Sequence, residues 1–521
     1  MGMVGLDRRI GSAFFVFCGQ YGDVRRFAEE QDVSRQWLYR EAAGVLDALE
    51  GTRTREVMDR LRQDNAALQA RVAELERRLQ VAVVIDDEKQ AEVATVGQAC
   101  GVTLPQCHTL LEVLIAKPLS VATLGRRTKA RGEKSGALLE VFDAYARQQV
   151  RDAAADEIYV RGPVLMVVEQ ESLCWISGRL SEEVSGAAWS QEFAQLPNLA
   201  QMAVDGGTGL AKGLDMVNEQ RQQQEKKPVV LQGDHFHALW TGGVGLRRAE
   251  KRASKALADA EAAQQALDAC ARQGRKQTGP AVRASHAWRK AERAMDAWRD
   301  LEGTWQQTKD ALLLVTPAGE LNSRAKAEAV VAQTLPQLPD SDFAKCKRKL
   351  EQPEMLNYLD YLHEQLAALP YPEEVKQAAV QQEALRRRPE LLKGENPQAA
   401  ALRGVLLLCA VVLGKADAVG TQAVEAVQQL MRRAYRASSL VECINSVLRM
   451  HQAQHRKMTQ GMLNLKRLYW NGHTFRTGRR RNTTPYQRLG VPWPPGMRWW
   501  DVLKLTPEQL RDKLSTARMA A

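Results

Sequence analysis

A run of seven residues with strict three-and-four spacing constrains the fold of this chain more than any other feature. Such spacing puts every member on one stripe of an α-helix, at the a and d positions of a coiled coil. The seven are Met58, Leu61, Asn65, Leu68, Val72, Leu75 and Leu79. Asn65 takes an a position, where a buried amide fixes the register and favours two parallel strands, and Arg71 and Glu76 at g and e′ form an attractive interchain pair. We therefore expect residues 54–80 to form a homodimer or higher oligomer; the alternative is an amphipathic helix packed on its own domain.

The segment before this helix has the pattern of a helix-turn-helix. VRRFAEEQ (24–31) and RQWLYREAAGVLDAL (35–49) are the expected helices, with Asp32-Val33 as the turn and Ser34 as the N-cap of the second helix. A small apolar core would use Val24, Phe27, Val33, Leu38 and Val45. The start of the second helix, where recognition helices contact bases and phosphates, then presents Arg35, Gln36, Tyr39 and Arg40 outward. DNA binding is the favoured interpretation, and a plain helical hairpin is the alternative.

Residues 86–150 are expected to be helical as well. EVATVGQACGVTLPQCHTLLEVLI has the helix, glycine turn and helix of a second DNA-binding region. Cys100, Cys107 and His108 lack a fourth ligand at a suitable spacing, so we interpret them as packing residues rather than a zinc site. The eight cysteines form no CxxC pair, which favours reduced thiols in a cytosol.

From about residue 156 the sequence pattern changes from helical to strand-like. EIYVRG, VLMVVEQES and LCWISGRLS predict three antiparallel strands, because β-branched and aromatic runs alternate with turn residues. GAAWSQEFAQL and GLAKGLDMVNEQRQQQ predict helices, and LAQMAVDGG and KPVVLQGDHFHAL predict two further strands. The resulting order, β-β-β-α-β-α-β, is that of the ribonuclease H fold.

The rest of the chain is helical and ends in a concentration of positive charge. Residues 245–436 predict helical hairpins broken at Gly and Pro positions, and SSLVECINSVLRMHQAQH predicts one more helix. From His455 to Ala521 there are 14 Lys and Arg against three Asp and Glu, a net charge of +11 that equals the net charge of the whole chain. A basic tail of this kind favours a polyanionic partner, most often nucleic acid, over a merely solvated tail.

These patterns predict a multidomain α/β protein. Its expected parts are a helix-turn-helix domain (1–50), a coiled coil (51–85), a second helical DNA-binding region (86–150), a ribonuclease H-like mixed sheet (151–244), an all-helical insertion (245–436), a further helix of the core (437–455) and a basic DNA-binding tail (456–521).

Three carboxylates are placed to meet in such a fold. Asp156 is expected at the start of the first strand and Asp205 at the end of the fourth, which are neighbours in this topology. Glu442 lies on the helix after the insertion, with Asn445 and Arg449 on the same helical face. Three converging carboxylates suit two Mg²⁺ ions that cleave a phosphodiester.

Other acidic groups compete for this role. Asp152 precedes the expected strand and ranks lower, and Glu157 would face the opposite side of the sheet. Glu169 and Glu171 are expected to flank the end of the second strand. His237 could instead be a hydrogen-bonded core histidine, and Asp234 could belong to a turn.

Several segments together resemble the DDE transposases of bacterial insertion sequences. They are AADEIYVRGPVLMVVEQESLCWISG, MAVDGGTGLAKGL, DHFH, SSLVECINSVLR and NGHTFRTGRRRNTTPYQRLGVP, covering about residues 150–240 and 430–492. The resemblance implies a ribonuclease H-like catalytic domain whose metal-binding acids are Asp156, Asp205 and Glu442. The family's Asp-x-x-His motif falls on Asp234 and His237, and a helical insertion before the Glu helix also occurs in several such families.

This resemblance implies a transposase that binds transposon ends and target as double-stranded DNA. The enzyme would hydrolyse a phosphodiester with two Mg²⁺ ions, which Mn²⁺ can replace, and transfer the freed 3′-hydroxyl to the target. The alternative is a non-catalytic DNA-binding regulator derived from a transposase.

Basic and aromatic residues suggest where DNA would be held. In the tail, Arg476, Arg479, Arg480 and Arg481 alternate with Tyr469, Trp470, Phe475 and Tyr486. In the insertion, Trp288, Trp298 and Trp305 lie among arginines and could stack on unpaired bases, although packing is the commoner role of tryptophan in a helical hairpin.

The sequence gives little reason to expect a membrane protein. The longest apolar run, Val405 to Leu413, is short enough to be one buried helix, and the N-terminus has no convincing export signal. We expect a cytoplasmic, nucleoid-associated protein without a membrane partner.

Overall fold

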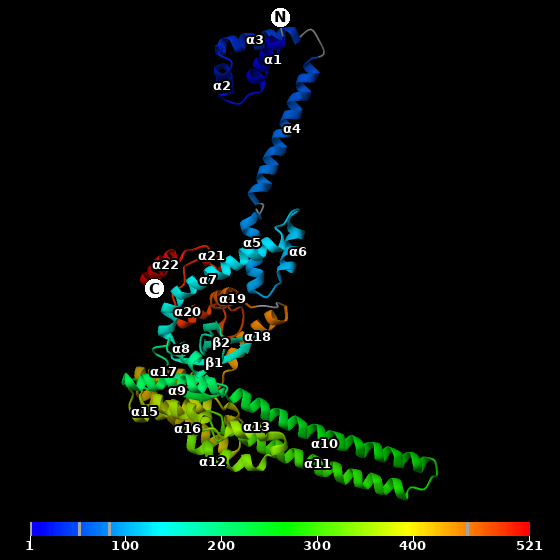
Figure 1. Ribbon diagram of the computed structural model, residues 1–521, viewed down its shortest axis with the longest axis vertical. Coiled ribbons are helices and arrows are strands. Elements are labelled where there is room, and N and C mark those ends of the chain that lie inside the picture. Colours follow the sequence, from blue (N-terminus) through cyan, green and yellow to red (C-terminus); the bar gives the residue numbers. More distant parts are fainter. Residues whose placement is uncertain (1–2, 50–53, 82–84, 455–457, 521) are drawn as a thin grey trace. The chain divides into compact units, whose positions relative to one another are not determined.

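The computed structural model describes residues 3–49, 54–81, 85–454 and 458–520 (Figure 1). These residues form two compact units, 1–86 and 87–521, which are described separately below. Most of the described chain is helical, and its one sheet has five strands, which agrees with a multidomain α/β protein. The junctions expected at 50/51 and 455/456 fall in stretches outside the described residues.

The first unit contains the expected helix-turn-helix pair, α2 (Asp23–Glu30) and α3 (Arg35–Leu49). The N-cap prediction is confirmed, because the Ser34 hydroxyl accepts the backbone N–H of Trp37 at 3.1 Å. A helix that the sequence did not suggest, α1 (Met3–Cys18), packs on this pair. The Phe15 and Phe27 ring centroids lie 4.4 Å apart, so three helices share one small core.

The heptad segment is a single helix, α4 (Thr54–Val81). Its apolar stripe faces solvent in the isolated chain, since Leu61 is 58% exposed and Leu68 is 65% exposed. Val72 and Leu75 are exposed too, whereas the side chain of Leu79 lies outside the described residues. No described residue of the first unit covers this stripe, so the alternative of an amphipathic helix packed on its own domain gains no support from the contacts within that unit.

The second unit is built around the sheet, whose strands follow the expected chain order. They are β1 (Asp152–Tyr159), β2 (Pro163–Glu169), β3 (Trp175–Leu180), β4 (Gln201–Val204) and β5 (Val230–Gly233). The spatial order is β3-β2-β1-β4-β5, with β1–β2 and β2–β3 antiparallel and β1–β4 and β4–β5 parallel. β1 begins four residues before Asp156, which corrects the expectation that Asp156 starts the strand.

The two faces of the sheet are covered by helices from distant parts of the chain (Figure 1). Ala153 and Ala155 of β1 pack in one core with α7 (Val121–Gln149), α8 (Gly186–Phe193), α9 (Thr208–Gln223) and α19 (Gln460–Gly472). Ala154 and Ile158 pack in a second core with α18 (Ser439–Gln454). Alternate residues of β1 therefore serve opposite faces, as a strand buried on both sides requires.

The C-terminal segment is part of the first of these cores, not an appended tail. Leu465, Tyr486, Trp499 and Leu510 are buried there together with residues of α7. They come from α19, α20 (Pro485–Leu489), α21 (Trp499–Val502) and α22 (Pro507–Ala520). Positive charge in residues 458–520 is thus carried on a folded surface. The helices α5 (Asp87–Ala99) and α6 (Leu104–Leu114) precede α7. Cys107 is buried between them as a packing residue, whereas Cys100 is exposed, which corrects its expected packing role.

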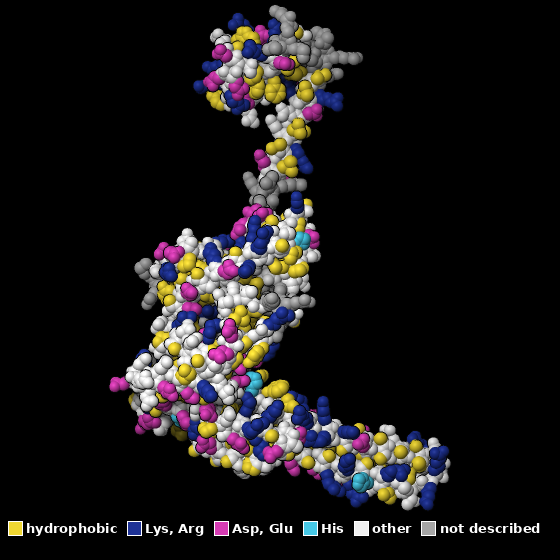
Figure 2. All heavy atoms as spheres, viewed as in Figure 1, with side chains coloured by type: hydrophobic (Ala, Val, Ile, Leu, Met, Phe, Trp, Pro, Cys, Tyr) yellow, Lys and Arg dark blue, Asp and Glu magenta, His cyan; other side chains and the backbone are white. Residues whose placement is uncertain are grey.

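The helical insertion begins earlier than expected. α10 (His235–Arg272) runs without a break through the expected boundary at 244/245, and β5 ends at Gly233 instead of extending through the DHFHAL segment. The Asp234 side chain caps α10 at the Phe236 N–H, which ends the strand and starts the helix. α10 and α11 (Thr278–Ala311) form a long hairpin, and Lys and Arg side chains line the face of it seen in Figure 2.

The remainder of the insertion is a bundle of shorter helices. They are α12 (Arg324–Thr334), α13 (Asp340–Leu350), α14 (Asn357–Ala367), α15 (Glu373–Arg386), α16 (Pro397–Lys415) and α17 (Asp417–Arg432), with short 3₁₀ turns η1 (Leu335–Gln337), η2 (Pro353–Leu356) and η3 (Pro389–Leu392). A fourth 3₁₀ turn, η4 (Gly478–Arg480), lies in the C-terminal segment.

The apolar helix α16 is not the buried helix that its sequence suggested. Leu407 is 68% and Leu408 67% exposed, while Cys409 and Leu413 are buried against α15 and α17. By length and composition, α16 is the one helix in the described part of the chain that could cross a bilayer, and 17% of its apolar window is buried. One such helix is weak evidence for a membrane span.

Candidate active site

Asp156 lies on β1, and Asp205 directly follows β4, the parallel strand beside β1. The β1–β4 ladder ends at the pair Ala155 and Val204; Asp156 is the next residue of β1, and Asp205 is the first residue after β4. Parallel strands lie about 4.8 Å apart, which brings the two backbones to that separation. Oδ1 of Asp205 accepts the Gly207 N–H at 2.9 Å, and Oδ1 of Asp156 accepts the Glu157 N–H at 2.9 Å. The expected convergence of the two aspartates at the sheet is therefore present in the backbone register.

Helix α18 brings the third carboxylate to the same face of the sheet. Val441, Ile444 and Leu448, spaced by three and four, are fully buried and pack the helix against the sheet. Nδ2 of Asn445 donates to Oδ2 of Asp156 at 3.1 Å. The Glu442 carboxylate pairs with Arg449 at 2.8 Å, so these two side chains share a helical face as expected.

The electrostatics at Asp156 show that the three acids act on one another. Burial, then the negative charges of Asp205, Glu442 and Glu157, raise the pKa of Asp156 to about 7. Burial and the charge of Asp205 also raise the pKa of Glu157, which approaches the Asp205–Gly207 loop from the other face. Converging carboxylates without a cation make one of them hold its proton.

A divalent cation would relieve this repulsion, and the side chains supply the hard oxygen donors that Mg²⁺ prefers. Oδ1 of Asn445 and Oε2 of Glu157 are buried without a hydrogen-bond partner. Against this, no group of three or more His, Cys, Asp and Glu side chains is arranged to hold a metal within the described ranges, and the Glu442 carboxylate is paired with Arg449. The chemistry of the three side chains suits a divalent cation, and Glu442 would have to exchange its ion pair with Arg449 to take part.

Asp234 and His237 lie beside the acids and link two elements. Oδ2 of Asp234 accepts Nδ1–H of His237 and, at 2.8 Å, the hydroxyl of Ser438 just before α18. Burial alone would raise the pKa of Asp234, but these hydrogen bonds hold it below its ordinary value. The bond to Asp234 raises the pKa of His237, and the charges of Asp205 and Asp156 add to the effect. His237 is half-buried and hydrogen-bonded to a carboxylate, which fits both a hydrogen-bonded core histidine and a residue that positions the scissile phosphate.

The insertion adds a cation that sequence reasoning missed. Nζ of Lys349, on α13, donates to the backbone carbonyl of Asp205 at 2.7 Å. The adjacent η2 turn is fixed to the sheet edge, where Nε2 of Gln232 donates to the Met355 carbonyl at 3.1 Å. Nothing in the local sequence marks Lys349, because it is one of several lysines on a helix far along the chain.

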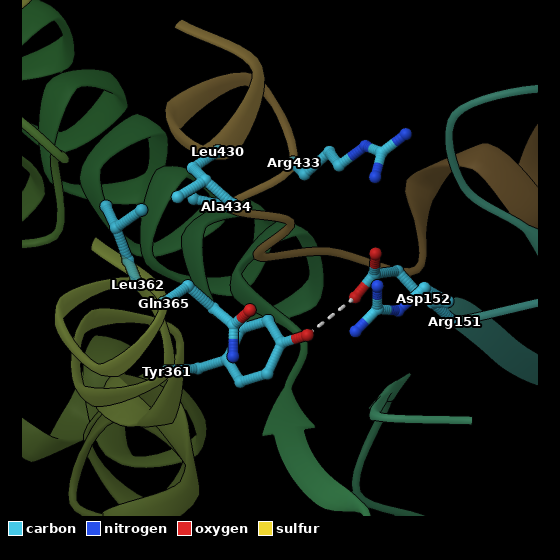
Figure 3. Close-up of a pocket in the computed structure, with 8 residues that line it drawn as sticks. All are labelled: Arg151, Asp152, Tyr361, Leu362, Gln365, Leu430, Arg433 and Ala434. Carbon is cyan, nitrogen blue, oxygen red and sulfur yellow. Dashed lines mark hydrogen bonds between the residues drawn. The ribbon is translucent and has the colours of Figure 1, made fainter. Parts of the chain in front are cut away.

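Asp152 is the first residue of β1, which corrects the expectation that it precedes the strand, and it lies in a different environment from the three acids (Figure 3). It lines a cavity of about 50 Å³ with Tyr361 and Arg433, and the Tyr361 hydroxyl donates to its Oδ1 at 3.5 Å. Burial and the charge of Glu169 raise the pKa of Asp152 to about 6. Glu169 ends β2 as expected, where it accepts the Ser172 N–H at 2.7 Å and serves the turn.

The residues expected to contact DNA are mostly on the surface. Arg35, Gln36, Tyr39 and Arg40 are exposed at the start of α3, and Arg476, Arg479 and Arg481 are exposed in the C-terminal segment. Arg480 is half-buried, with Nε donating to the Glu171 carbonyl at 3.1 Å. The aromatic residues between these arginines pack inward instead: Tyr486 is fully buried, and the Trp470 indole donates to the Leu173 carbonyl at 2.8 Å.

The three tryptophans of the hairpin are packing residues to different degrees. Trp305 is buried in the core between α10, α11 and α13, against Phe343 and the small surface of Gly242. Trp288 is half-buried between α10 and α11, where its indole donates to Gln264 at 3.3 Å. Trp298 is half-buried and its indole nitrogen is enclosed without a partner.

Comparisons with protein families, with curated proteins and with solved structures found no match to this chain.

Proposed function

We propose that this protein is a DNA transposase of the DDE type, which cleaves a phosphodiester at a transposon end and transfers the freed 3′-hydroxyl to target DNA. One observation carries the proposal: Asp156 on β1 lies near Asp205, which directly follows the neighbouring parallel strand β4, and Glu442 reaches the same face from a helix after a long insertion. The strand order β3-β2-β1-β4-β5 supports a ribonuclease H-like core, in which acids at these positions have this role.

The proposed cofactor is a pair of Mg²⁺ ions, or Mn²⁺ in their place, held by Asp156, Asp205 and Glu442. When bound, such ions activate the attacking oxygen and stabilise the leaving oxygen of an in-line displacement. The repulsion that raises the pKa of Asp156 favours this assignment, because a divalent cation would replace the proton that the carboxyl otherwise keeps.

The neighbouring side chains would position the reacting groups. Asn445 fixes one oxygen of Asp156 by its hydrogen bond and leaves the carboxylate aimed at the site. Asp234 holds Nδ1 of His237, so that Nε2 is available to donate to a phosphate oxygen when the ring is protonated. Lys349, bonded to the Asp205 carbonyl, brings a further positive charge to the edge where a phosphate would lie. Arg449 would release Glu442 and bind a phosphate instead.

DNA would be held by the helix-turn-helix and by the basic C-terminal surface. Exposed Arg35, Gln36, Tyr39 and Arg40 at the start of α3 suit base and phosphate contacts in a major groove. The uncovered stripe on α4 suits a parallel dimer with a second copy, in which two helix-turn-helix domains bind two DNA sites. Such a protein would act in the cytoplasm on nucleoid DNA.

A non-catalytic DNA-binding regulator is the alternative, and one observation favours it. Glu442 is neutralised by Arg449 at 2.8 Å in this structure, an arrangement that holds the carboxylate away from a metal. A regulator would keep this ion pair permanently and would bind DNA without cutting it.

Cleavage assays on DNA flanking the gene separate the two functions. We expect wild-type protein to cut this DNA in Mg²⁺ or Mn²⁺. Asp156→Asn, Asp205→Asn and Glu442→Gln should bind it in EDTA as the wild type does but fail to cut it in Mg²⁺ or Mn²⁺. Asp152→Asn is the matched control, since it replaces a buried carboxylate of the same strand outside the proposed site and should still cut. Wild-type protein that binds the DNA and never cuts it would support the regulator.

A further inference from the structure

A second site with a distinct chemistry is formed where the insertion meets the C-terminal segment. It is a cavity of about 960 Å³ whose lining includes six arginines from three separate parts of the chain. They are Arg387, Arg432, Arg436, Arg479, Arg480 and Arg488. The remaining lining includes two glutamates, Glu171 and Glu383, and the ring of Tyr435. We call this the arginine cavity.

Only part of this positive charge is balanced within the protein. Arg387 pairs with Glu383 at 2.9 Å. Glu171 pairs at 2.8 Å with Arg433, which does not line the cavity. Arg436 donates to the Leu312 carbonyl at 2.5 Å and lies over the Tyr358 ring, and Arg480 donates to the carbonyls of Glu171 and Gln170. These contacts fix the two guanidinium groups but do not neutralise them.

The other three arginines have no such contact. Among the residues that the structure describes, Arg432, Arg479 and Arg488 make no ion pair and no side-chain hydrogen bond. The charge of Arg488 also disfavours the charged form of Arg480, since burial and then this repulsion lower the pKa of Arg480. Five of the six lining arginines have no ion pair with a carboxylate among the described residues, so their charges repel one another, and a multivalent anion would reduce that repulsion.

Guanidinium groups also specify which anion fits. Their planar fork binds phosphate oxygens in pairs, and several of them around one cavity suit successive phosphates better than one small ion. The cavity is joined to the acids through a short piece of chain: the Arg436 carbonyl accepts the His235 N–H at 2.8 Å, and Ser438, two residues on, is bonded to Asp234. α18 with Glu442 starts immediately afterwards.

We propose that the arginine cavity binds consecutive backbone phosphates of the DNA and so fixes the strand whose end lies at the acids. This inference rests on the proposed function for its partner, and it adds Arg432 and Arg488 to the DNA contacts, neither of which was marked by the sequence.

The test is a salt titration of DNA binding in EDTA, with full-length protein and duplex DNA from beside the gene. Arg432→Ala/Arg488→Ala removes two cations that make no ion pair and no side-chain hydrogen bond within the described residues. We expect the slope of log K against log salt to become less steep by about 1.8, because each duplex phosphate contact contributes about 0.9. Arg386→Ala/Lys393→Ala is the matched control; it removes two exposed cations that lie outside the cavity and should leave the slope unchanged.

Thermal melts with inorganic pyrophosphate identify the source of the phosphate. If the double variant loses a pyrophosphate-dependent stabilisation that the control keeps, while its DNA slope stays at the wild-type value, the cavity holds a small free anion and the backbone assignment is wrong. An unchanged slope together with unchanged melts also overturns the proposal. If wild-type protein never cuts DNA but the slope still falls in the double variant, the transposase reaction is wrong and the arginine cavity stands as a DNA site.

Discussion

Asn445 donates a hydrogen bond from Nδ2 to Oδ2 of Asp156 at 3.1 Å, although 289 positions separate the two residues. Asn445 is buried, and its other amide atom, Oδ1, has no partner. The bond fixes the orientation of one carboxylate oxygen and couples α18 to β1. If the proposed reaction occurs, Asn445 is a positioning residue of the site.

We expect Asn445→Ala to lower the rate of Mg²⁺-dependent cleavage by about 10- to 100-fold, the usual effect of losing a residue that orients a metal ligand. The rate should recover partly at higher Mg²⁺ concentration, because the loosened carboxylate binds metal more weakly. Ser446→Ala, an exposed position on the same helix, is the control. A loss of rate that no Mg²⁺ concentration restores would mean that Asn445 serves only the packing of α18.

The raised pKa of Asp156 predicts how stability depends on pH. This carboxyl keeps its proton to about pH 7 in the folded chain, against an ordinary value of 3.8. The folded state therefore binds more protons than the unfolded state between these values, and stability falls as pH rises through the window. In EDTA, we expect the folding stability of the wild type to fall between pH 5 and pH 8 by on the order of 1–3 kcal/mol more than that of Asp156→Asn. Thermal melts at both pH values measure the difference, and Mg²⁺ should restore wild-type stability at pH 8.

The coiled-coil prediction concerns Asn65 on α4. Asn65→Leu should raise the melting temperature and loosen the choice between dimer and higher oligomers, because it removes the polar pair that fixes register. Gln63→Leu, at an exposed f position of the same helix, should change neither property. Sedimentation of the full-length protein at micromolar concentration provides the measurement. A monomer in that experiment would contradict the oligomer itself.

Trp305 and Trp288 of the α10–α11 hairpin are expected to respond differently to substitution by alanine. Trp305→Ala should cost about 3–5 kcal/mol of folding stability, because the ring fills the core beside Gly242 and Phe343. Pre-opened DNA ends should not rescue its cleavage. Trp288→Ala should cost less, since the side chain is half-buried between two alanine-rich helices. Recovery of Trp288→Ala activity on pre-opened ends, with an unchanged melt, would instead assign this ring to base stacking.

Deletion of residues 455–521 is not a useful test of DNA binding, because Leu465, Tyr486 and Leu510 belong to the main core. Arg476→Ala/Arg481→Ala is better suited, since both side chains are exposed. We expect the salt slope to become less steep by about 1.8. Arg511→Ala, on the exposed face of α22, controls for a general change in charge. A slope equal to that of the wild type would exclude this arginine group from the DNA contact.

Much of the architecture could be predicted from local patterns. The order of strands and helices from β1 to β5 follows from runs of β-branched residues and their turns, and Ser34 marked the start of α3. The boundaries were harder. Asp152-Ala153-Ala154-Ala155 has no strand pattern and becomes β1 because both faces are covered by helices. The DHFHAL segment was assigned to a strand because the capping role of Asp234 was not recognised.

Some residues of the candidate site could also be predicted from the sequence, and others could not. Asp156, Asp205 and Glu442 could be proposed because their elements were recognisable, and Asp152 could be ranked lower. Lys349 and the arginine cavity could not be found, because their groups come from segments whose contacts depend on tertiary packing. The basic charge of the C-terminal residues was visible in the sequence, but their place in the core was not, since Leu465 and Tyr486 are spread among arginines and lysines.

The hydrogen bond between Asp234 and Ser438 joins the two ends of the helical insertion. The helical insertion leaves the sheet at His235 and returns at Arg436, and these two residues are bonded backbone to backbone at 2.8 Å. The entry and exit points of the insertion therefore coincide, as the two ends of a stem do. Helices beyond this stem can therefore differ in number or length without changing the span between β5 and α18, except for α13 and η2, which bond to the Asp205 carbonyl and to Gln232 at the sheet edge.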